Sequence, residues 1–197
     1  MESTAIIEVL SQRLAANPSL FEAADAKDGM PTIYVPLDRL TEVGAVLRDD
    51  PALRFVFLAD VVPVDYYPRQ PRFEVIYILV CPAAGGYGDT PKRLRMKIRV
   101  PEGTAVPTLS NLWASANWAE REAYDLYGLA FAAHPDPRRI LMPEDWEGFP
   151  MRKDYPVQIN QAVKTYEPLQ VSEEEFVANV EAARRTPLRQ KGPAHRS

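Results

Sequence analysis

The sequence predicts an α+β fold: a small antiparallel or mixed sheet packed with helices, followed by a long proline-rich, irregular C-terminal extension. Three strand-like runs lie at residues 55–66, 72–81 and 92–100, and in the second and third of them apolar side chains recur at every second position. Segments with helical spacing of apolar residues come before and after these runs, an order that is typical of helices packed on a sheet. Proline is about twice as frequent as in an average protein and recurs every few residues from 135 to 156.

The first fifty residues are expected to hold two helices and two short strands. Residues 3–16 carry the apolar stripe of an amphipathic helix, capped by Ser or Thr at its start. Residues 21–26 and 32–35 are short strand candidates, with a turn at Asp28-Gly29 between them. Residues 36–47, which start with a proline and end before an acidic pair, predict the second helix.

The three strand-like runs are expected to pair through antiparallel hairpins. Pro63 lacks a backbone donor, so part of the first run should be an edge strand or a bulge. The glycine-rich residues 85–88 lack both the Gly-Lys-Ser/Thr ending and the following helix of a phosphate loop, and they predict a hairpin turn.

The third run, residues 92–100, has one apolar face and one strongly basic face. The basic face consists of Arg93, Arg95, Lys97 and Arg99. Two interpretations stay open. The residues could be a solvated face or an edge protected by charge, or they could dock onto an acidic partner.

Two consecutive helices are expected after the third strand. Residues 108–116 place their apolar side chains on one helical face. Asn117 is the expected N-cap of the next helix, with Glu120 completing a capping pattern and Arg121 and Asp125 forming an i,i+4 pair. Gly128 is the expected residue after the helix, where a left-handed backbone favours glycine.

The chain therefore predicts a head domain at residues 1–128 and a partner-wrapping segment at residues 129–197. Prolines at 135, 137, 143, 150 and 156 remove backbone donors and predict a stiff, irregular path that needs a surface to lie on. Ser172 is expected to cap a short helix that ends near Arg185. The basic tail beyond it is expected to be flexible.

Composition excludes several classes of function. The net charge of −4 gives no support to nucleic-acid binding. A single cysteine, Cys81, makes no internal disulfide, zinc knuckle or iron–sulfur cluster, and its apolar surroundings predict a buried small side chain. The N-terminus lacks the pattern of a signal peptide, and no apolar run approaches the ~18 residues that suggest a membrane span.

The sequence shows no catalytic, cofactor-binding or metal-binding set of residues. His134 lies next to Pro135 and Asp136, and the nearest further carboxylates are Glu144 and Asp145, without the spacing of a metal site. A structural histidine is the favoured interpretation. No nucleophile elbow is present.

Residues 117–156 instead have the composition of a protein–protein contact, because aromatic residues and arginines alternate with carboxylates. The candidate interface residues are Trp118, Glu120, Arg121, Glu122, Asp125, His134, Arg138, Arg139, Trp146, Arg152, Lys153, Asp154 and Tyr155.

The same segment carries three consecutive motifs. They read E-R-E-x-Y-D-L-x-G from Glu120 to Gly128, F-x-x-H-P-D-x-R-R-I-L from Phe131 to Leu141, and P-x-D-W-x-G-x-P-x-R-K-D-Y-P from Pro143 to Pro156. In this order they resemble the signature of the C subunit of the proton-pumping NADH:quinone oxidoreductase, the family of the 30 kDa subunit of mitochondrial complex I. Pro137 and Met151 stand where that family usually has leucine.

The resemblance implies a non-catalytic structural subunit of the peripheral arm of complex I, which supports electron transfer from NADH to quinone. Its partners would be the quinone-site D subunit, of the 49 kDa type, and neighbouring iron–sulfur subunits. This chain would hold no cofactor, whereas the partner subunits would hold flavin and iron–sulfur clusters. The chain would lie peripherally on the cytoplasmic face of the inner (plasma) membrane and meet the membrane only through the complex.

The resemblance also implies roles for the candidate residues. Charged residues on the helix would fix the junction of head and extension: Glu120, Arg121, Glu122 and Asp125. Charged residues of the extension would contact partners: Arg138, Arg139, Arg152, Lys153 and Asp154. Trp118, Trp146 and Tyr155 would be apolar anchors. Two alternatives stay open: a free-standing adaptor, and a small enzyme that uses His134 and nearby carboxylates.

Overall fold

The computed structural model describes residues 3–13, 21–24, 26–82, 91–156 and 172–185. The chain divides into two compact units, Met1–Tyr155 and Pro156–Ser197, which are described separately. The expected glycine-rich hairpin turn and the basic tail from residue 186 lie outside the described residues.

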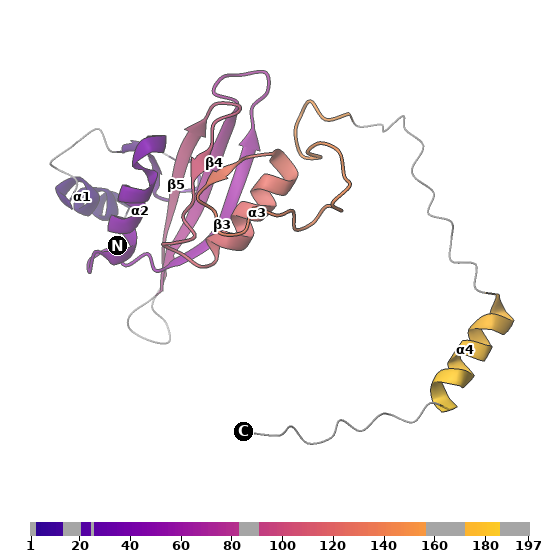
Figure 1. Ribbon diagram of the computed structural model, residues 1–197. Helices are drawn as coiled ribbons and strands as arrows, with labels where there is room; N and C mark the ends of the chain where they lie inside the picture. The colour runs from indigo at the N-terminus through magenta and orange to yellow at the C-terminus, as the bar shows by residue number, and fades with distance from the viewer. Residues whose placement is uncertain (1–2, 14–20, 25, 83–90, 157–171, 186–197) are drawn as a thin grey trace. The chain divides into compact units, whose positions relative to one another are not determined.

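The first unit is built on a five-stranded mixed sheet (Figure 1). Its strands, in spatial order, are β1 (Glu22–Ala24), β2 (Thr32–Tyr34), β5 (Lys92–Val100), β4 (Phe73–Cys81) and β3 (Phe57–Asp65). All neighbours pair antiparallel except β2 and β5, which pair parallel. The predicted α+β class with a mixed sheet is therefore confirmed, as are the three long strands.

Alternating burial explains why these segments are strands. Tyr77 of β4 pairs with Met96 of β5, and Val75 pairs with Ile98. All four side chains are buried in one core cluster, whereas the next residues along β4, Ile76 and Ile78, are only half-buried. One face of the sheet therefore carries the core.

Helices supply the other half of this core. The described helices of the unit are α1 (Ser3–Arg13), the short 3-10 helix η2 (Leu37–Arg39), α2 (Leu40–Asp49) and α3 (Ala116–Tyr127). Buried residues of α1, α2 and α3 belong to the same cluster as the inward residues of β4 and β5. Figure 1 shows α3 beside β3, in agreement with the packing of these two elements. The predicted first and second helices are confirmed over the described residues.

The edge strand β3 confirms the expectation from Pro63. β3 lies at one end of the strand order, and its pairing with β4 shifts register between Leu58 and Asp60. The turn at Asp28-Gly29 is also confirmed, because Gly29 has a φ of 71° and its N–H donates to the carbonyl oxygen of Ala26 over 3.0 Å. Cys81 differs from the prediction, since it is half-buried at the end of β4 and is not fully enclosed.

The predicted helix at residues 108–116 is wrong. This segment forms successive turns, with Trp113 N–H donating to the carbonyl oxygen of Leu109 over 2.9 Å. Just before it, β6 (Val106–Pro107) pairs parallel with β7 (Phe131–Ala132). The predicted N-cap at Asn117 is wrong as well, because α3 starts at Ala116. The end of α3 is confirmed: Gly128 is left-handed, with a φ of 72°.

Residues 129–155 belong to the same compact unit as the sheet. The N–H of Met151 donates to the carbonyl oxygen of Leu126 over 3.1 Å, and β7 pairs with β6. A boundary between a head at residues 1–128 and a wrapping segment at 129–197 stays a prediction about how the chain meets its partners.

In the second unit, α4 (Glu173–Arg185) confirms the predicted short helix. The N–H of Glu175 donates to the hydroxyl oxygen of Ser172 over 3.2 Å, which is the expected N-cap interaction. Phe176 and Val177 are exposed on this helix.

Candidate functional site

Glu120 is the buried centre of α3 and does not complete a capping pattern. Its carboxylate accepts a hydrogen bond from the Thr108 hydroxyl over 2.5 Å and one from the Leu109 N–H over 2.7 Å. No described arginine or lysine pairs with it, and its solvent exposure is 0%. Burial raises the pKa of Glu120 to about 7, although the two hydrogen bonds oppose the rise. Glu120 therefore fixes the turns of residues 108–116 against α3.

The stability of the chain should consequently fall as pH rises from about 4.5 to about 7, because the native state holds the Glu120 proton longer than the unfolded state does. A pKa change of this size corresponds to about 3 kcal/mol. The Glu120→Gln variant lacks this pH-dependent contribution. The difference in free energy of unfolding between the variant and the wild type should therefore shift in favour of the variant as pH rises across that window. Urea unfolding of both chains from pH 4 to pH 8 measures the difference. Glu122→Gln, an exposed carboxylate on the same helix, is the control and should run parallel to the wild type. A constant difference between Glu120→Gln and wild type would contradict the prediction.

His134 is a structural histidine in this geometry. The N–H of Asp136 donates to Nδ1 over 3.0 Å, so Nδ1 is an acceptor and the ring proton lies on Nε2. Nε2 lies 3.1 Å from the carbonyl oxygen of Asn117, to which it donates. The Glu120 carboxylate is 3.8 Å from the same nitrogen, and the His134 side chain is 3% exposed. Both ring nitrogens are engaged, which leaves neither free for a metal or a substrate proton.

Asp125 anchors the extension on α3. Its Oδ2 accepts hydrogen bonds from three consecutive N–H groups, those of Ile140, Leu141 and Met142, over 2.7–3.0 Å. Its Oδ1 accepts one from Arg139 over 2.8 Å. Burial raises the pKa of Asp125, but the backbone donors and Arg139 outweigh it and hold that pKa below its usual range. Three convergent N–H groups favour a carboxylate as they would any anion.

Arg121 holds the same stretch from its other side. Its Nε donates to the carbonyl oxygen of Arg138, and its Nη2 donates to that of Arg139, each over 3.0 Å. It also pairs with Asp136 over 3.3 Å. The sequence predicted an Arg121–Asp125 pair, but Arg139 is the arginine that meets Asp125. Arg138 is 78% exposed and forms a surface fork with Asp136.

Arg72, which sequence reasoning missed, is the centre of a second anchor. Its side chain is 2% exposed and forms a fork with Asp65, over 3.0 and 3.1 Å. Asp154 and Glu102 accept further hydrogen bonds from it over 2.5–3.0 Å. Asp65 also accepts from the N–H of Lys153 over 2.9 Å. Burial opposes the charge on Asp65, yet these donors lower its pKa to about 2.

Arg152 contacts the C-terminal end of α3. It donates from Nε to the carbonyl oxygen of Tyr127 over 2.6 Å and pairs with Glu102 over 3.1 Å. Its guanidinium lies 4.8 Å from the ring centre of Phe149. A side chain at Gly128 would meet the Phe149 ring at 2.5 Å and the Arg152 guanidinium at 2.7 Å, so only glycine fits this crossing.

Five predicted residues have exposed side chains: Trp118, Glu122, Arg138, Lys153 and Asp154. Trp118 is 65% exposed, with Arg121 lying 5.4 Å from its ring centre. Leu141 and Met151, which were not among the candidates, are 59% and 53% exposed.

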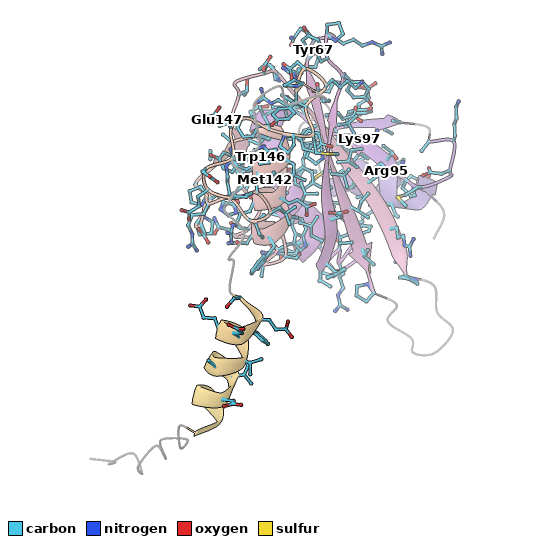
Figure 2. All side chains as sticks on the ribbon, turned by 90° about the vertical axis from the view of Figure 1, so that its right-hand side faces the viewer. Tyr67, Arg95, Lys97, Met142, Trp146 and Glu147 are labelled. Atoms are coloured by element: carbon cyan, nitrogen blue, oxygen red, sulfur yellow. The ribbon has the colours of Figure 1, made fainter. Side chains whose placement is uncertain are left out.

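Trp146 and Tyr155 lie inward by comparison. Trp146 is half-buried, and its indole N–H is buried without a hydrogen-bond partner among the described residues. Figure 2 shows Trp146 together with Met142 and Glu147 on one side of the unit. The Tyr155 hydroxyl donates to the carbonyl oxygen of Glu147 over 3.3 Å.

Within the described residues, no group of three histidine, cysteine, aspartate or glutamate side chains lies close enough to hold a metal ion. The same part of the chain holds no helix long and apolar enough to cross a membrane.

Comparison with known proteins gives consistent matches. Residues 33–161, more than half of the chain, match the family model described as respiratory-chain NADH dehydrogenase, 30 Kd subunit. The C subunit of NADH-quinone oxidoreductase from Roseiflexus sp. (strain RS-1) is 42% identical over 159 residues, which cover 80% of this chain and 88% of that protein. The C 2 subunit of NADH-quinone oxidoreductase from Rhizobium meliloti (strain 1021) is 45% identical, covering 70% of this chain and 72% of that protein.

Solved structures agree with the sequence matches. A trypsin-resistant fragment of Nqo5 is 36% identical with a TM-score of 0.54, covering 66% of this chain and 98% of the fragment. A chain of the membrane-bound sulfane sulfur reductase, an archaeal respiratory membrane complex, has a TM-score of 0.61 over 97% of this chain and 98% of that one. Its identity of 18% shows a shared fold only.

Proposed function

This chain belongs to the family of the 30 kDa subunit of respiratory-chain NADH dehydrogenase, and from that premise we propose that it is a non-catalytic structural subunit of the peripheral arm of NADH:quinone oxidoreductase. In this proposal it supports electron transfer from NADH to quinone by docking on the quinone-site D subunit, of the 49 kDa type. The names of its relatives, as C subunits of NADH-quinone oxidoreductase, support membership of a multi-subunit assembly.

One observation carries the docking proposal. Several charged residues of the three motifs bind one another, the sheet or the backbone, as Asp125 does with Arg139 and Asp154 does with Arg72. Three large apolar side chains are also left outward on the same segment, those of Trp118, Leu141 and Met151, among exposed charged residues such as Glu122 and Lys153. Exposed tryptophan beside fixed arginines is the composition of an interface centre. The charges therefore shape the surface, and the apolar side chains supply its contact.

The proposal extends to cofactors and location. The chain itself holds no cofactor, and flavin and iron–sulfur clusters belong to the partner subunits. The protein lies peripherally on the cytoplasmic face of the inner (plasma) membrane and meets the membrane only through the complex. Its other neighbours are iron–sulfur subunits of the same arm.

The two alternatives have less support. An enzyme built on His134 needs a free ring nitrogen, and both nitrogens of His134 are hydrogen-bonded. A free-standing adaptor would use the proline-rich segment, but residues 129–155 are tied to α3 and the sheet by Asp125 and Arg72.

Removing the Trp118 side chain tests the docking surface. Because Trp118 is 65% exposed, Trp118→Ala should change the stability of the free chain by less than about 0.5 kcal/mol. Loss of an interface tryptophan typically costs about 2–4 kcal/mol of binding, so the variant should assemble poorly. The measurement is the amount of tagged chain that copurifies from detergent-treated membranes with flavin, iron–sulfur signals and NADH:quinone activity.

Arg69→Ala, which removes an exposed side chain in the β3–β4 connection, is the control and should assemble as the wild type does. A lysine-reactive cross-linker on the wild-type complex, acting at the exposed Lys153, identifies the neighbour and should give the D subunit. Normal assembly of Trp118→Ala, or copurification of the chain alone, would refute the docking proposal.

A further inference from the structure

The described helices of the first unit pack on one face of the sheet, and the other face carries an apolar stripe. On this face of β4 the half-buried residues are Ile76, Ile78 and Val80. Across the register, Val62 of β3 pairs with Ile76, and Phe57 pairs with Val80. Phe57 is 52% exposed and Val62 is 38% exposed. These five residues are called the open-face stripe below. They lie on the side of the sheet opposite the core, with the exposed Asp60, which pairs with Ile78, between Val62 and Phe57 on β3.

A row of basic residues borders the open-face stripe. On β5, Arg93 pairs with Val80, Arg95 with Ile78, and Lys97 with Ile76. The row, completed by Arg99, meets two carboxylates: Asp28 pairs with Arg95 over 2.6 Å, and Glu74 pairs with Lys97 over 2.8 Å. The row therefore stays basic on a chain whose net charge is −4.

The basic row also lines a hollow of about 350 Å³. Its wall includes Arg95, Lys97 and Lys27, the carboxylate of Asp28, and the hydroxyls of Thr32 and Tyr34. Figure 2 shows Arg95 and Lys97 on the opposite side of the unit, in that view, from Met142, Trp146 and Glu147. The hollow has room for a side chain, and the exposed Lys27 on its wall adds a cation to the Arg95–Asp28 and Lys97–Glu74 pairs. This surface is thus separate from the one that includes Trp118 and the extension.

Two other modes of association fit the geometry less well. Addition of a strand to the edge of β3 is hindered, because Pro63 lacks a donor, the strand bulges after Leu58, and the Leu58 carbonyl oxygen already accepts from Ser115 over 2.8 Å. A two-fold contact with a second copy would set the basic row against its own equivalent, since such interfaces oppose identical surfaces. The face is therefore built for side-chain contact with a surface of opposite charge.

We propose that the open-face stripe and the basic row form a second docking surface, for a different protein chain that presents apolar side chains beside an aspartate or glutamate. The proposal rests on the proposed function, in which the partner is another subunit of the same assembly. A membrane is the less favoured occupant, because three of the five stripe residues, Ile76, Ile78 and Val80, are half-buried and offer little apolar surface for insertion.

Site-directed photo-cross-linking tests this surface in the assembled complex. The tagged full-length chain carries benzoylphenylalanine in place of Val62, is purified from membranes in mild detergent with the complex, and is irradiated. We expect an adduct with one other protein chain, at an apolar residue close to an acidic one. The same photo-reactive residue in place of Ala52, an exposed position in the turn after α2, is the control and should not label that chain at that site.

Charge reversal provides a second readout. Arg93→Glu, at an exposed position of the basic row, should lower the adduct yield at Val62 several-fold, because it sets a carboxylate against the acidic partner. Arg69→Glu reverses an exposed charge elsewhere and should leave the yield unchanged. An adduct only with lipid, with a second copy of this chain or with nothing, while the chain still copurifies with the complex, would overturn the second docking surface alone. Failure of the unlabelled chain to copurify would overturn the proposed function first.

Discussion

Replacing Arg72 with methionine is expected to lower the free energy of unfolding by about 3–5 kcal/mol, the range measured when one partner of a buried ion pair is removed. The side chains of Arg72 and Asp65 are each only 2% exposed, so the substitution leaves Asp65 charged and enclosed without its guanidinium. Glu102 and Asp154 are 45% and 40% exposed, and each should contribute less than about 1 kcal/mol to the loss. Urea unfolding at pH 7 measures the change.

The loss should depend on pH in a defined direction. In the wild type the pKa of Asp65 is lowered to about 2 from 3.8, so its stabilising charge is present above pH 3.8 and is lost as pH falls toward 2. In Arg72→Met the native Asp65 takes up its proton at higher pH, so the deficit should be largest near neutrality and shrink in acid.

The matched control for Arg72 is Asp154→Asn, which removes an exposed charge and keeps an acceptor. It should cost about 1 kcal/mol or less. The double variant Asp65→Asn with Arg72→Met removes both buried charges and should recover part of the stability, because the introduced amide oxygen would still accept from the backbone. An equal, pH-independent loss in all three variants would show that the buried pair is not the source of the effect.

The long strands of this protein were predictable because their pattern is local. In β4 and β5 buried residues recur at every second position, and in β5 the sequence alternates accordingly between apolar and basic residues from Leu94 to Val100. Pro63 predicted the edge strand β3 from a local feature as well, because a residue without a backbone N–H donor is tolerated at the edge of a sheet and not in its centre. The parallel pairing of β2 with β5 joins two strands that are separated in the sequence by β3 and β4. Local periodicity could not predict this pairing.

The segment at residues 108–116 was not predictable from its own spacing. Leu109, Leu112 and Trp113 fit a helical face, and Leu109 and Trp113 are indeed buried. However, the hydrogen bonds that decide the backbone come from elsewhere: Glu120 takes the Leu109 N–H, and the Trp113 indole donates to the carbonyl oxygen of Phe55 over 2.9 Å. Tertiary partners outweigh a weak local preference here.

The sequence located the segment that holds the candidate site, but it did not predict the role of each residue in it. Composition located residues 117–156, yet it could not separate charges that face partners from charges that fix the segment to its own sheet. A signal for the second kind was present: Asp65 follows Val61 and Pro63 in the inward series of β3, where a charged residue needs a buried partner. The Trp118 and Glu122 side chains, by contrast, face outward.

This division changes which variants report on assembly. Arg139 engages Asp125 and the carbonyl oxygen of Gly148, so Arg139→Ala disturbs the fold before it disturbs any partner. Trp118 and Glu122 are exposed, so their variants report on docking itself. An assembly defect in Arg139→Ala would therefore reflect the shape of the segment and would not by itself map a contact.

Replacing Asp125 with alanine is expected to release residues 138–142 from α3. The variant leaves three N–H groups and Arg139 without their shared acceptor. A hydrogen bond to a charged group contributes about 1.5–3 kcal/mol, and such bonds do not add fully, so the expected loss is about 3 kcal/mol or more. Limited trypsin digestion of the full chain measures the release directly, because the backbone carbonyls of Arg138 and Arg139 are held by Arg121 in the wild type. Cleavage after these two arginines should be faster in the variant.

Glu122→Ala separates this effect from loss of helical charge. It removes a carboxylate from the same helix, but that carboxylate is exposed and accepts no hydrogen bond from the described residues, so digestion should match the wild type. If Asp125→Ala were cleaved no faster than Glu122→Ala, the extension would be held by contacts other than those of the Asp125 carboxylate. If it is cleaved faster and also fails to assemble, while Glu122→Ala keeps the wild-type digestion pattern, the path of residues 138–155 over α3 is a precondition for docking.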